Sequence, residues 1–74
     1  MSEADKMFEE LDYHKFFGNE NYLEYKYTVG GADLSIVFWH KDQKVSKESN
    51  MRCGYITMQE LKAINKKCEE LGWI

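Results

Sequence analysis

The sequence predicts a single α+β domain over residues 1–74, with an N-terminal helix, an antiparallel meander of three to four strands and a C-terminal helix. Three observations predict it. Apolar residues repeat with helical spacing near both ends of the chain, whereas apolar and polar residues alternate through the middle. Clusters of Gly and Asn divide the middle into segments of strand length. We expect both helices to pack on one face of the sheet and the reverse face to stay largely open to water.

The first helix is predicted over residues 2–11. Four apolar residues follow the i, i+3, i+4, i+7 spacing of one helix face: Ala4, Met7, Phe8 and Leu11. Ser2 is a favourable N-cap residue, and Asp5 places negative charge in the first turn, where the helix dipole is positive. Asp12 follows the last apolar residue, and Asp tolerates the left-handed conformation that often ends a helix.

The first part of the meander is predicted from alternation and turn signals. Residues 13–17 are a candidate for a short strand, and the Gly-Asn-Glu-Asn run at 18–21 favours a turn because Gly and Asn accept positive φ. Residues 22–29 alternate as a half-buried strand does. One face of that strand is apolar: Leu23, Tyr25, Tyr27 and Val29.

The second part of the meander begins with a hairpin turn at residues 30–33, which opens with two glycines. Residues 34–40 form the next strand and are apolar on both faces. Three of them are expected in the core: Leu34, Ile36 and Phe38. Residues 44–47 are predicted as a short polar edge strand, and residues 48–54 as a loop.

The C-terminal helix carries its own start and stop signals. Thr57 and Glu60 have the spacing of a capping box, in which each side chain accepts a backbone N–H of the first turn. Gly72 follows the helix where a left-handed residue is favoured. An apolar stripe between these signals is expected to pack on the sheet: Leu61, Ile64, Cys68 and Leu71.

Length and composition limit the function classes. A chain of 74 residues buries only about 60 % of the surface that its unfolded form exposes, which disfavours a deep enclosed active site. Its start is polar and acidic, unlike a signal peptide, and its longest apolar run is Ile36–Trp39, which is too short to span a membrane. Two cysteines are too few for a disulfide scaffold and favour reduced thiols. We therefore expect a cytoplasmic protein with no membrane contact.

Charge is unevenly spread around a net value of −3. Residues 1–12 carry five acids and one Lys, whereas residues 40–55 carry four basic and two acidic side chains. A nucleic-acid-binding protein usually has a much larger basic footprint. A base-stacking platform of Tyr25, Tyr27 and Phe38 would also lie on the side that the helices need to cover. Nucleic acid is therefore a disfavoured partner.

The sequence offers no arrangement typical of an enzyme, a metal site or a cofactor site. Four side chains could bind zinc by type, but their spacing matches no finger or ribbon: His14, His40, Cys53 and Cys68. A glycine-rich phosphate loop is absent, because the Gly30-Gly31 pair is explained by a hairpin turn. We expect no enzymatic activity, no metal and no cofactor.

Several segments together resemble a known group of proteins. They are Met7–Tyr13, the aromatic hairpin around 22–27 and 36–38, and the C-terminal stretches 56–67 and 70–73. In these segments the chain resembles small hypothetical proteins encoded by phages and prophages of Gram-positive bacteria. The resemblance covers most of the chain and is most specific at the C-terminal end.

The resemblance implies a context and no activity. Members tend to have Gly where this chain has Asp12, which bears on the end of the first helix. A protein of this group would be a phage-borne accessory protein made in the cytoplasm of its bacterial host cell. Such proteins commonly bind and inhibit a host protein, including components of defence systems.

The candidate binding site lies on the reverse face of the sheet. Tyr22, Val37 and Trp39 are expected to form an apolar patch there, and such patches often mark protein interfaces. Four basic residues follow along the chain, where they are expected to adjoin Trp39 and to attract an acidic partner: Lys41, Lys44, Lys47 and Arg52. The sequence thus predicts a non-enzymatic protein that binds a host protein. The alternatives are a homodimer or other structural module that buries the patch, and a nucleic-acid binder that uses the basic 41–52 edge.

Overall fold

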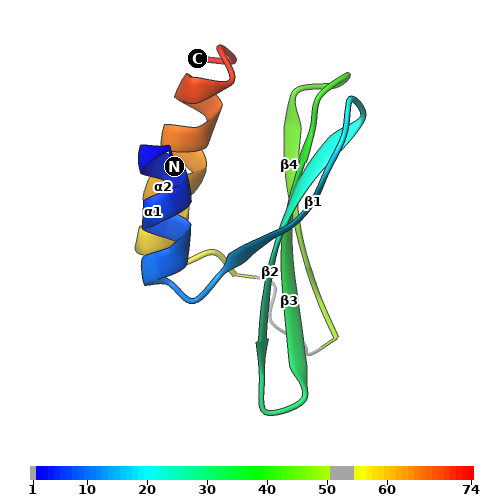
Figure 1. The fold of residues 1–74 in the computed structure, drawn as a ribbon, viewed down its shortest axis with the longest axis vertical. Helices are drawn as coiled ribbons and strands as arrows, with labels where there is room; N and C mark the ends of the chain where they lie inside the picture. The colour runs from blue at the N-terminus through cyan, green and yellow to red at the C-terminus, as the bar shows by residue number, and fades with distance from the viewer. Residues whose placement is uncertain (1, 51–54) are drawn as a thin grey trace.

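The computed structural model describes residues 2–50 and 55–74 (Figure 1). Its elements in chain order are α1 (Glu3–Glu10), β1 (His14–Gly18), β2 (Tyr22–Val29), β3 (Ala32–Trp39), β4 (Lys44–Ser49) and α2 (Met58–Glu70). The four strands form one antiparallel sheet in the order β1-β2-β3-β4. The predicted α+β architecture, helix then meander then helix, is confirmed, and residues 13–17 do contribute a strand.

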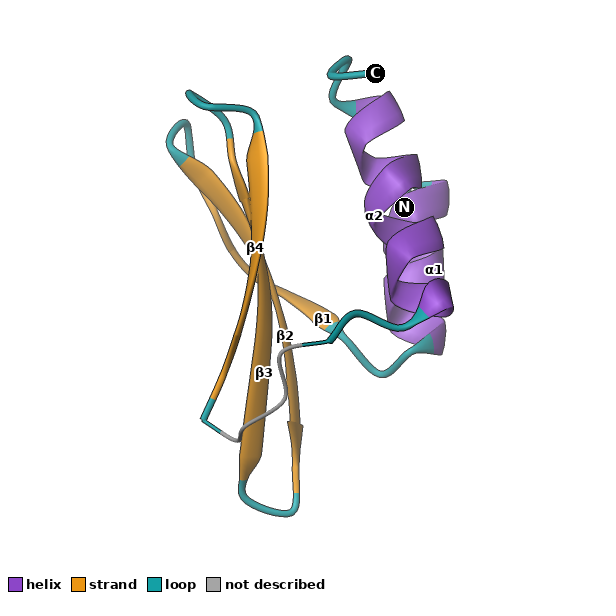
Figure 2. Ribbon diagram, turned by 180° about the vertical axis from the view of Figure 1, so that it is seen from behind, coloured by secondary structure: helices purple, strands orange, loops and turns teal. Residues whose placement is uncertain are grey.

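The molecule has two layers (Figures 1 and 2). The helices α1 and α2 run antiparallel and side by side, and both cover one face of the sheet. The hairpin between β2 and β3 extends beyond the end of the helix layer, so the sheet is the longer of the two layers. Neither α1 nor α2 covers the second face of the sheet; we call it the open face.

The core lies between the two layers and is largely aromatic. Phe8 of α1 stacks on Tyr25 of β2, with ring centroids 4.2 Å apart and planes 15° apart. The ring of Phe38 meets both of these rings edge-on, at 6.1 Å and 5.9 Å. The remaining buried apolar residues around these rings are Tyr13, Leu23, Ile36, Ala63 and Ile64. One α1 residue, Phe8, therefore anchors the first helix on the sheet.

The predicted helix ends agree with the structure. Ser2 caps α1, because its hydroxyl accepts the Asp5 N–H at 3.1 Å. Asp12 ends the first helix with φ of 67°, and Gly72 follows α2 with φ of 78°. Thr57 and Glu60 form both hydrogen bonds of the capping box. These signals act within one turn of helix, which is why the sequence predicts them.

The buried face of α2 differs from the predicted stripe. Ile64 is buried, and Cys68 and Leu71 are half-buried, but Leu61 is 38 % exposed. Two charged residues of α2, Glu60 and Lys67, are instead buried on the side of the helix that faces the core. They can be buried because each meets oppositely charged groups from another element, as described below.

Two strand boundaries also differ from the prediction. β3 begins at Ala32, because it pairs with β2 up to the glycine turn, and β4 continues to Ser49. Asn50 supports this end of the sheet: its side-chain amide donates to the Gly31 carbonyl and its side-chain oxygen accepts the Asp33 N–H, both at 2.9 Å. The predicted loop is therefore shorter at its start, and its residues 51–54 lie outside the described residues.

Candidate functional site

The register of the strands defines the side chains of the open face row by row. Rows are set by residues that pair across neighbouring strands and point to the same side. The first row holds Tyr22, Trp39 and Lys44. The second row holds Phe17, Glu24, Val37 and Ser46. The third row holds His14, Lys26, Ser35 and Glu48.

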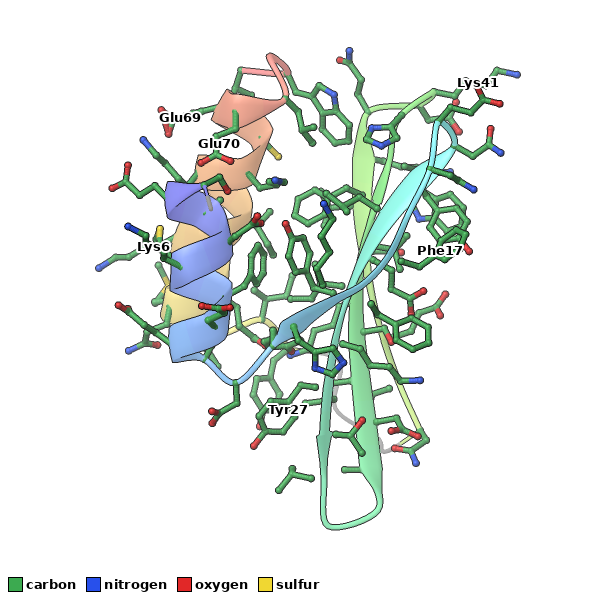
Figure 3. The ribbon with its side chains drawn as sticks, viewed as in Figure 1. Lys6, Phe17, Tyr27, Lys41, Glu69 and Glu70 are labelled. Carbon is green, nitrogen blue, oxygen red and sulfur yellow. The ribbon has the colours of Figure 1, made fainter. Side chains whose placement is uncertain are left out.

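A bulge in β1 adds aromatic side chains to this face. The pairing with β2 shifts between Lys15, which lies opposite Tyr25, and Phe17, which lies opposite Glu24. A bulge of this kind changes the direction of the side chains that follow it. Phe17 therefore points away from the helices, as Figure 3 shows, and the Phe16 ring lies 4.7 Å from the Lys26 ammonium on the same face. The sequence predicts the strand but carries no clear signal for the bulge.

Three aromatic rings from the first and second rows lie next to one another on the open face. The Tyr22 ring lies 5.3 Å from the Phe17 ring and 5.2 Å from the Trp39 ring, measured between centroids. We call Phe17, Tyr22 and Trp39 the aromatic strip. The indole of Trp39 donates from Nε1 to the Ser46 hydroxyl at 3.0 Å. This hydrogen bond fixes the indole over β4, so the strip is ordered before any partner arrives.

Val37 forms the floor of the strip. It is only 4 % exposed although neither α1 nor α2 covers this side of the sheet. Ser46 lies opposite Val37 on β4, and the hydrogen bond to Ser46 holds the Trp39 indole beside that pair. Two of the predicted site residues, Tyr22 and Trp39, are half-buried and stay in contact with solvent. The structure thus brings the predicted apolar group together on one surface.

Two of the predicted basic residues lie at the same end of the sheet as the strip. Lys41 is exposed in the turn between β3 and β4, where Figure 3 shows its side chain pointing away from the sheet. Lys44 lies beside Trp39 in the first row, and its ammonium is 3.5 Å from the Asp42 carboxylate. Both partners of that pair are more than half exposed, so the pair contributes little stability. Arg52, the fourth predicted basic residue, lies outside the described residues.

Lys47 is separated from this group. It lies opposite Ile36, a core residue, and therefore points toward the helices. Its ammonium is 2.9 Å from Glu60 Oε1, and the two side chains are only 9 % and 7 % exposed. Lys44 and Lys47 are three residues apart, and an odd separation along a strand places side chains on opposite faces. The expectation that Lys47 adjoins Trp39 is corrected by this register.

Glu60 is the centre of a buried polar cluster at the junction of the layers. Its carboxylate accepts the Tyr13 hydroxyl at 2.6 Å, the Thr57 N–H at 2.8 Å and the Lys47 ammonium. Burial alone would raise the pKa of Glu60, but these donors lower the pKa below its ordinary value. Burial and the neighbouring Glu60 carboxylate raise the pKa of Tyr13. The cluster links α2 to β4 and to the start of β1.

Asp5 forms a second polar cluster, between α1, α2 and β2. Its carboxylate accepts the Tyr25 hydroxyl and lies 3.5 Å from the Lys67 ammonium. Lys67 also lies 3.6 Å from Glu70, whose Oε2 accepts the Ala4 N–H at 3.0 Å. Burial opposes ionisation of Asp5, but the hydrogen bond from Tyr25 and the charge of Lys67 lower its pKa. These groups satisfy one another, so the cluster holds the layers together and presents no reactive group.

The two clusters predict that the fold loses stability in acid. The pKa values of Asp5 and Glu60 are lowered in the folded state, so their contribution is complete above the unfolded values of 3.8 and 4.5. It is lost as the pH falls through the lower folded values. We expect the melting temperature to be level near pH 7 and to fall steeply below about pH 4.5. Thermal unfolding followed by far-UV dichroism across this range tests it, and an unchanged melting temperature at about pH 3 would contradict the role of the clusters.

The structure also locates the residues that were considered for metal binding and for base stacking. In residues 2–50 and 55–74, no group of three or more His, Cys, Asp or Glu side chains gathers to hold a metal. His14 pairs with Lys26 near one edge of the sheet, whereas the His40 ring lies 6.1 Å from Trp73. Cys53 lies outside the described residues. Tyr25 and Phe38 are buried in the core, which closes the base-stacking platform on the helix side.

A shallow apolar groove lies on the helix side of the sheet, near the C-terminal end of α1 and the N-terminal end of α2. It has a volume of about 250 Å³ and is lined by Leu11, Tyr13, Tyr27, Leu34, Thr57 and Glu60. Figure 3 shows Tyr27 at this position. The carboxylate that reaches the groove is Glu60, whose oxygens already accept three donors. The Glu60 carboxylate is therefore engaged within the fold, and the walls of the groove are mainly apolar.

The chain was compared with protein families, curated proteins and solved structures. The chain matches no protein-family model, no curated protein and no solved structure. Among the helices that the structure describes, none has the length and apolar character needed to cross a membrane. The resemblance to phage-encoded proteins stays a prediction.

Proposed function

We propose that this chain is a non-enzymatic binding protein that contacts another protein through the open face of its sheet. The observation that carries the proposal is the aromatic strip, an ordered set of rings on the face opposite α1 and α2. Tyr and Trp are the residues most enriched at the energetic centres of protein interfaces. In a small domain that already has a separate aromatic core, aromatic side chains that remain in contact with solvent often mark an interaction surface.

The chemistry of the surface indicates the kind of partner. The strip offers a flat apolar area, and Lys41 and Lys44 add positive charge at one end of it. We propose a partner that presents apolar side chains bordered by carboxylates, because such a surface complements both parts. Following the resemblance to phage-encoded proteins, the partner would be a host protein in the bacterial cytoplasm, such as a component of a defence system, and binding would inhibit it.

The test is affinity capture from a lysate of Gram-positive bacteria, followed by titration of the captured protein. Trp39→Ala is expected to lower the affinity by about 30-fold or more, as loss of an interface hot spot does. Tyr55→Ala is a matched control, because Tyr55 is also an exposed aromatic residue but lies outside the open face. Equal capture by wild type and Trp39→Ala, with native dichroism in both, would contradict the placement of the site.

The alternative nucleic-acid function makes a different prediction. Aromatic rings on a sheet beside lysines can stack single-stranded bases, and the strip supplies such rings. The same face also carries Glu24, Glu48 and Asp33, which repel phosphates. A nucleic-acid binder would show salt-dependent association with single-stranded DNA or RNA. We expect no such association, even at low salt.

A further inference from the structure

The open face has complementary ends. Its first row combines two aromatic rings with a positive charge, in Tyr22, Trp39 and Lys44. On β2, β3 and β4, its third row combines a cation, a small residue and a negative charge, in Lys26, Ser35 and Glu48; His14 of β1 completes that row at the edge of the sheet. The second row, which contains Val37, lies midway between them. Each of the strands β2, β3 and β4 therefore carries, two residues either side of this midline, a pair of side chains that suit one another.

Such a surface matches a copy of itself. A two-fold axis between two stacked sheets, running across the strands at the level of Val37, brings the first row of one copy over the third row of the other. Lys44 then meets Glu48 of the second copy, and Trp39 covers Ser35. Tyr22 meets Lys26, whose ammonium lies 4.7 Å from the Phe16 ring of its own copy, so that rings from both copies flank the cation. Symmetry repeats each of these contacts, so the favourable pairs occur twice.

From this complementarity we infer that a second copy of the chain closes the open face, as an isologous dimer of two stacked sheets. Stacked sheets lie about 10 Å apart, which Val37 and the Trp39 indole from both copies can fill. The helices do not obstruct the contact, because they cover the opposite side of each sheet (Figure 2). This inference rests on the proposed function in taking the open face as the binding surface, and it makes dimerisation the regulator of that surface.

Two features make the dimer reversible. Glu24 lies in the midline row, so it faces Glu24 of the second copy and the two carboxylates repel. Lys44 must exchange its present partner, Asp42, for Glu48 of the second copy, which an exposed pair at 3.5 Å permits at little cost. A dimer weakened in this way dissociates at low concentration and releases the aromatic strip to a partner.

Charge reversal tests the arrangement directly. Sedimentation equilibrium of the wild-type chain, from micromolar to millimolar concentration, is expected to show a monomer–dimer equilibrium. Lys44→Glu and Glu48→Lys each create like-charge contacts and are expected to weaken the dimer by about tenfold or more. The double variant Lys44→Glu/Glu48→Lys restores the opposite charges and should recover most of the wild-type affinity. Glu24→Gln removes the midline repulsion and should strengthen the dimer.

The controls separate folding from association. All four variants change residues on the open face and not in the core between the layers, and native far-UV dichroism of each verifies that they fold. A chain that stays monomeric throughout the concentration range overturns the inference. So does a dimer whose affinity is unchanged by Lys44→Glu and Glu48→Lys, since the contact must then lie elsewhere.

Failure of this inference is distinguishable from failure of the proposed function. If the wild type is monomeric but Trp39→Ala still loses the captured partner, only the dimer is overturned. If the dimer responds to the charge reversals but no partner depends on Trp39, the dimer stands and the proposed function fails. If both hold, Glu24→Gln should bind the partner more weakly than wild type, because its stronger dimer competes with the partner for the open face.

Discussion

Glu60→Ala is expected to lower the free energy of unfolding by about 3–5 kcal/mol. The change leaves the Lys47 ammonium at a site where only 9 % of its side chain is exposed, without its carboxylate partner. It also removes the acceptor of the Tyr13 hydroxyl and one half of the capping box at Thr57. A chain of this length has a total stability of about 4–11 kcal/mol, so the substitution removes a large share of it. Urea unfolding followed by dichroism measures the loss.

The double variant Lys47→Met/Glu60→Leu provides the control for this prediction. Removing both charges leaves no buried ion unpaired, and apolar side chains of similar size can occupy the space. We expect the double variant to be more stable than Lys47→Met alone or Glu60→Leu alone. A loss in Glu60→Ala of less than about 1 kcal/mol would mean that solvent reaches the pair and that the cluster does not hold the layers together.

Phe8→Ala is expected to lower the free energy of unfolding by about 3–5 kcal/mol. Phe8 is fully buried, stacks on Tyr25 at 4.2 Å and meets Phe38 edge-on. Its loss leaves a cavity between the helix layer and the sheet, and the large rings around it cannot close that cavity without moving the strands. Thermal and urea unfolding measure the effect.

Phe16→Ala is the matched control for the core substitution. Phe16 is the same residue type, but it is 55 % exposed on the open face. Its replacement is expected to change stability by less than about 1 kcal/mol. Equal losses in Phe8→Ala and Phe16→Ala would contradict the assignment of the core to the space between the layers.

Local signals explain how much of the fold the sequence predicts. The Ser2 cap, the Thr57–Glu60 capping box and the positive φ of Gly72 each depend on residues within one turn of one another. Alternation along residues 22–29 predicts which side chains face the helices. The same rule places Tyr22 opposite Trp39 once the hairpin turn at Gly30 is located. The fold class follows from these local features.

The parts that the sequence does not predict depend on contacts between distant elements. Lys67 and Glu60 are charged, and a charge on a helix is usually assigned to solvent; their burial follows only from partners such as Asp5 and Lys47, far away in the chain. The β1 bulge, which places Phe17 on the open face, depends on the register against β2. The position of Lys47 is different, since counting along β4 already separates it from Lys44.

The emission of Trp39 tests the central claim, that the open face is the surface through which this protein associates. Trp73→Phe leaves Trp39 as the sole indole of the chain and keeps an aromatic ring near Phe38. Fluorescence of this variant should be measured as the chain concentration is raised and as the captured partner is added. We expect the emission to shift to shorter wavelength as complex forms, because the half-exposed indole becomes buried. A complex that forms without any shift in the Trp39 emission would contradict the claim.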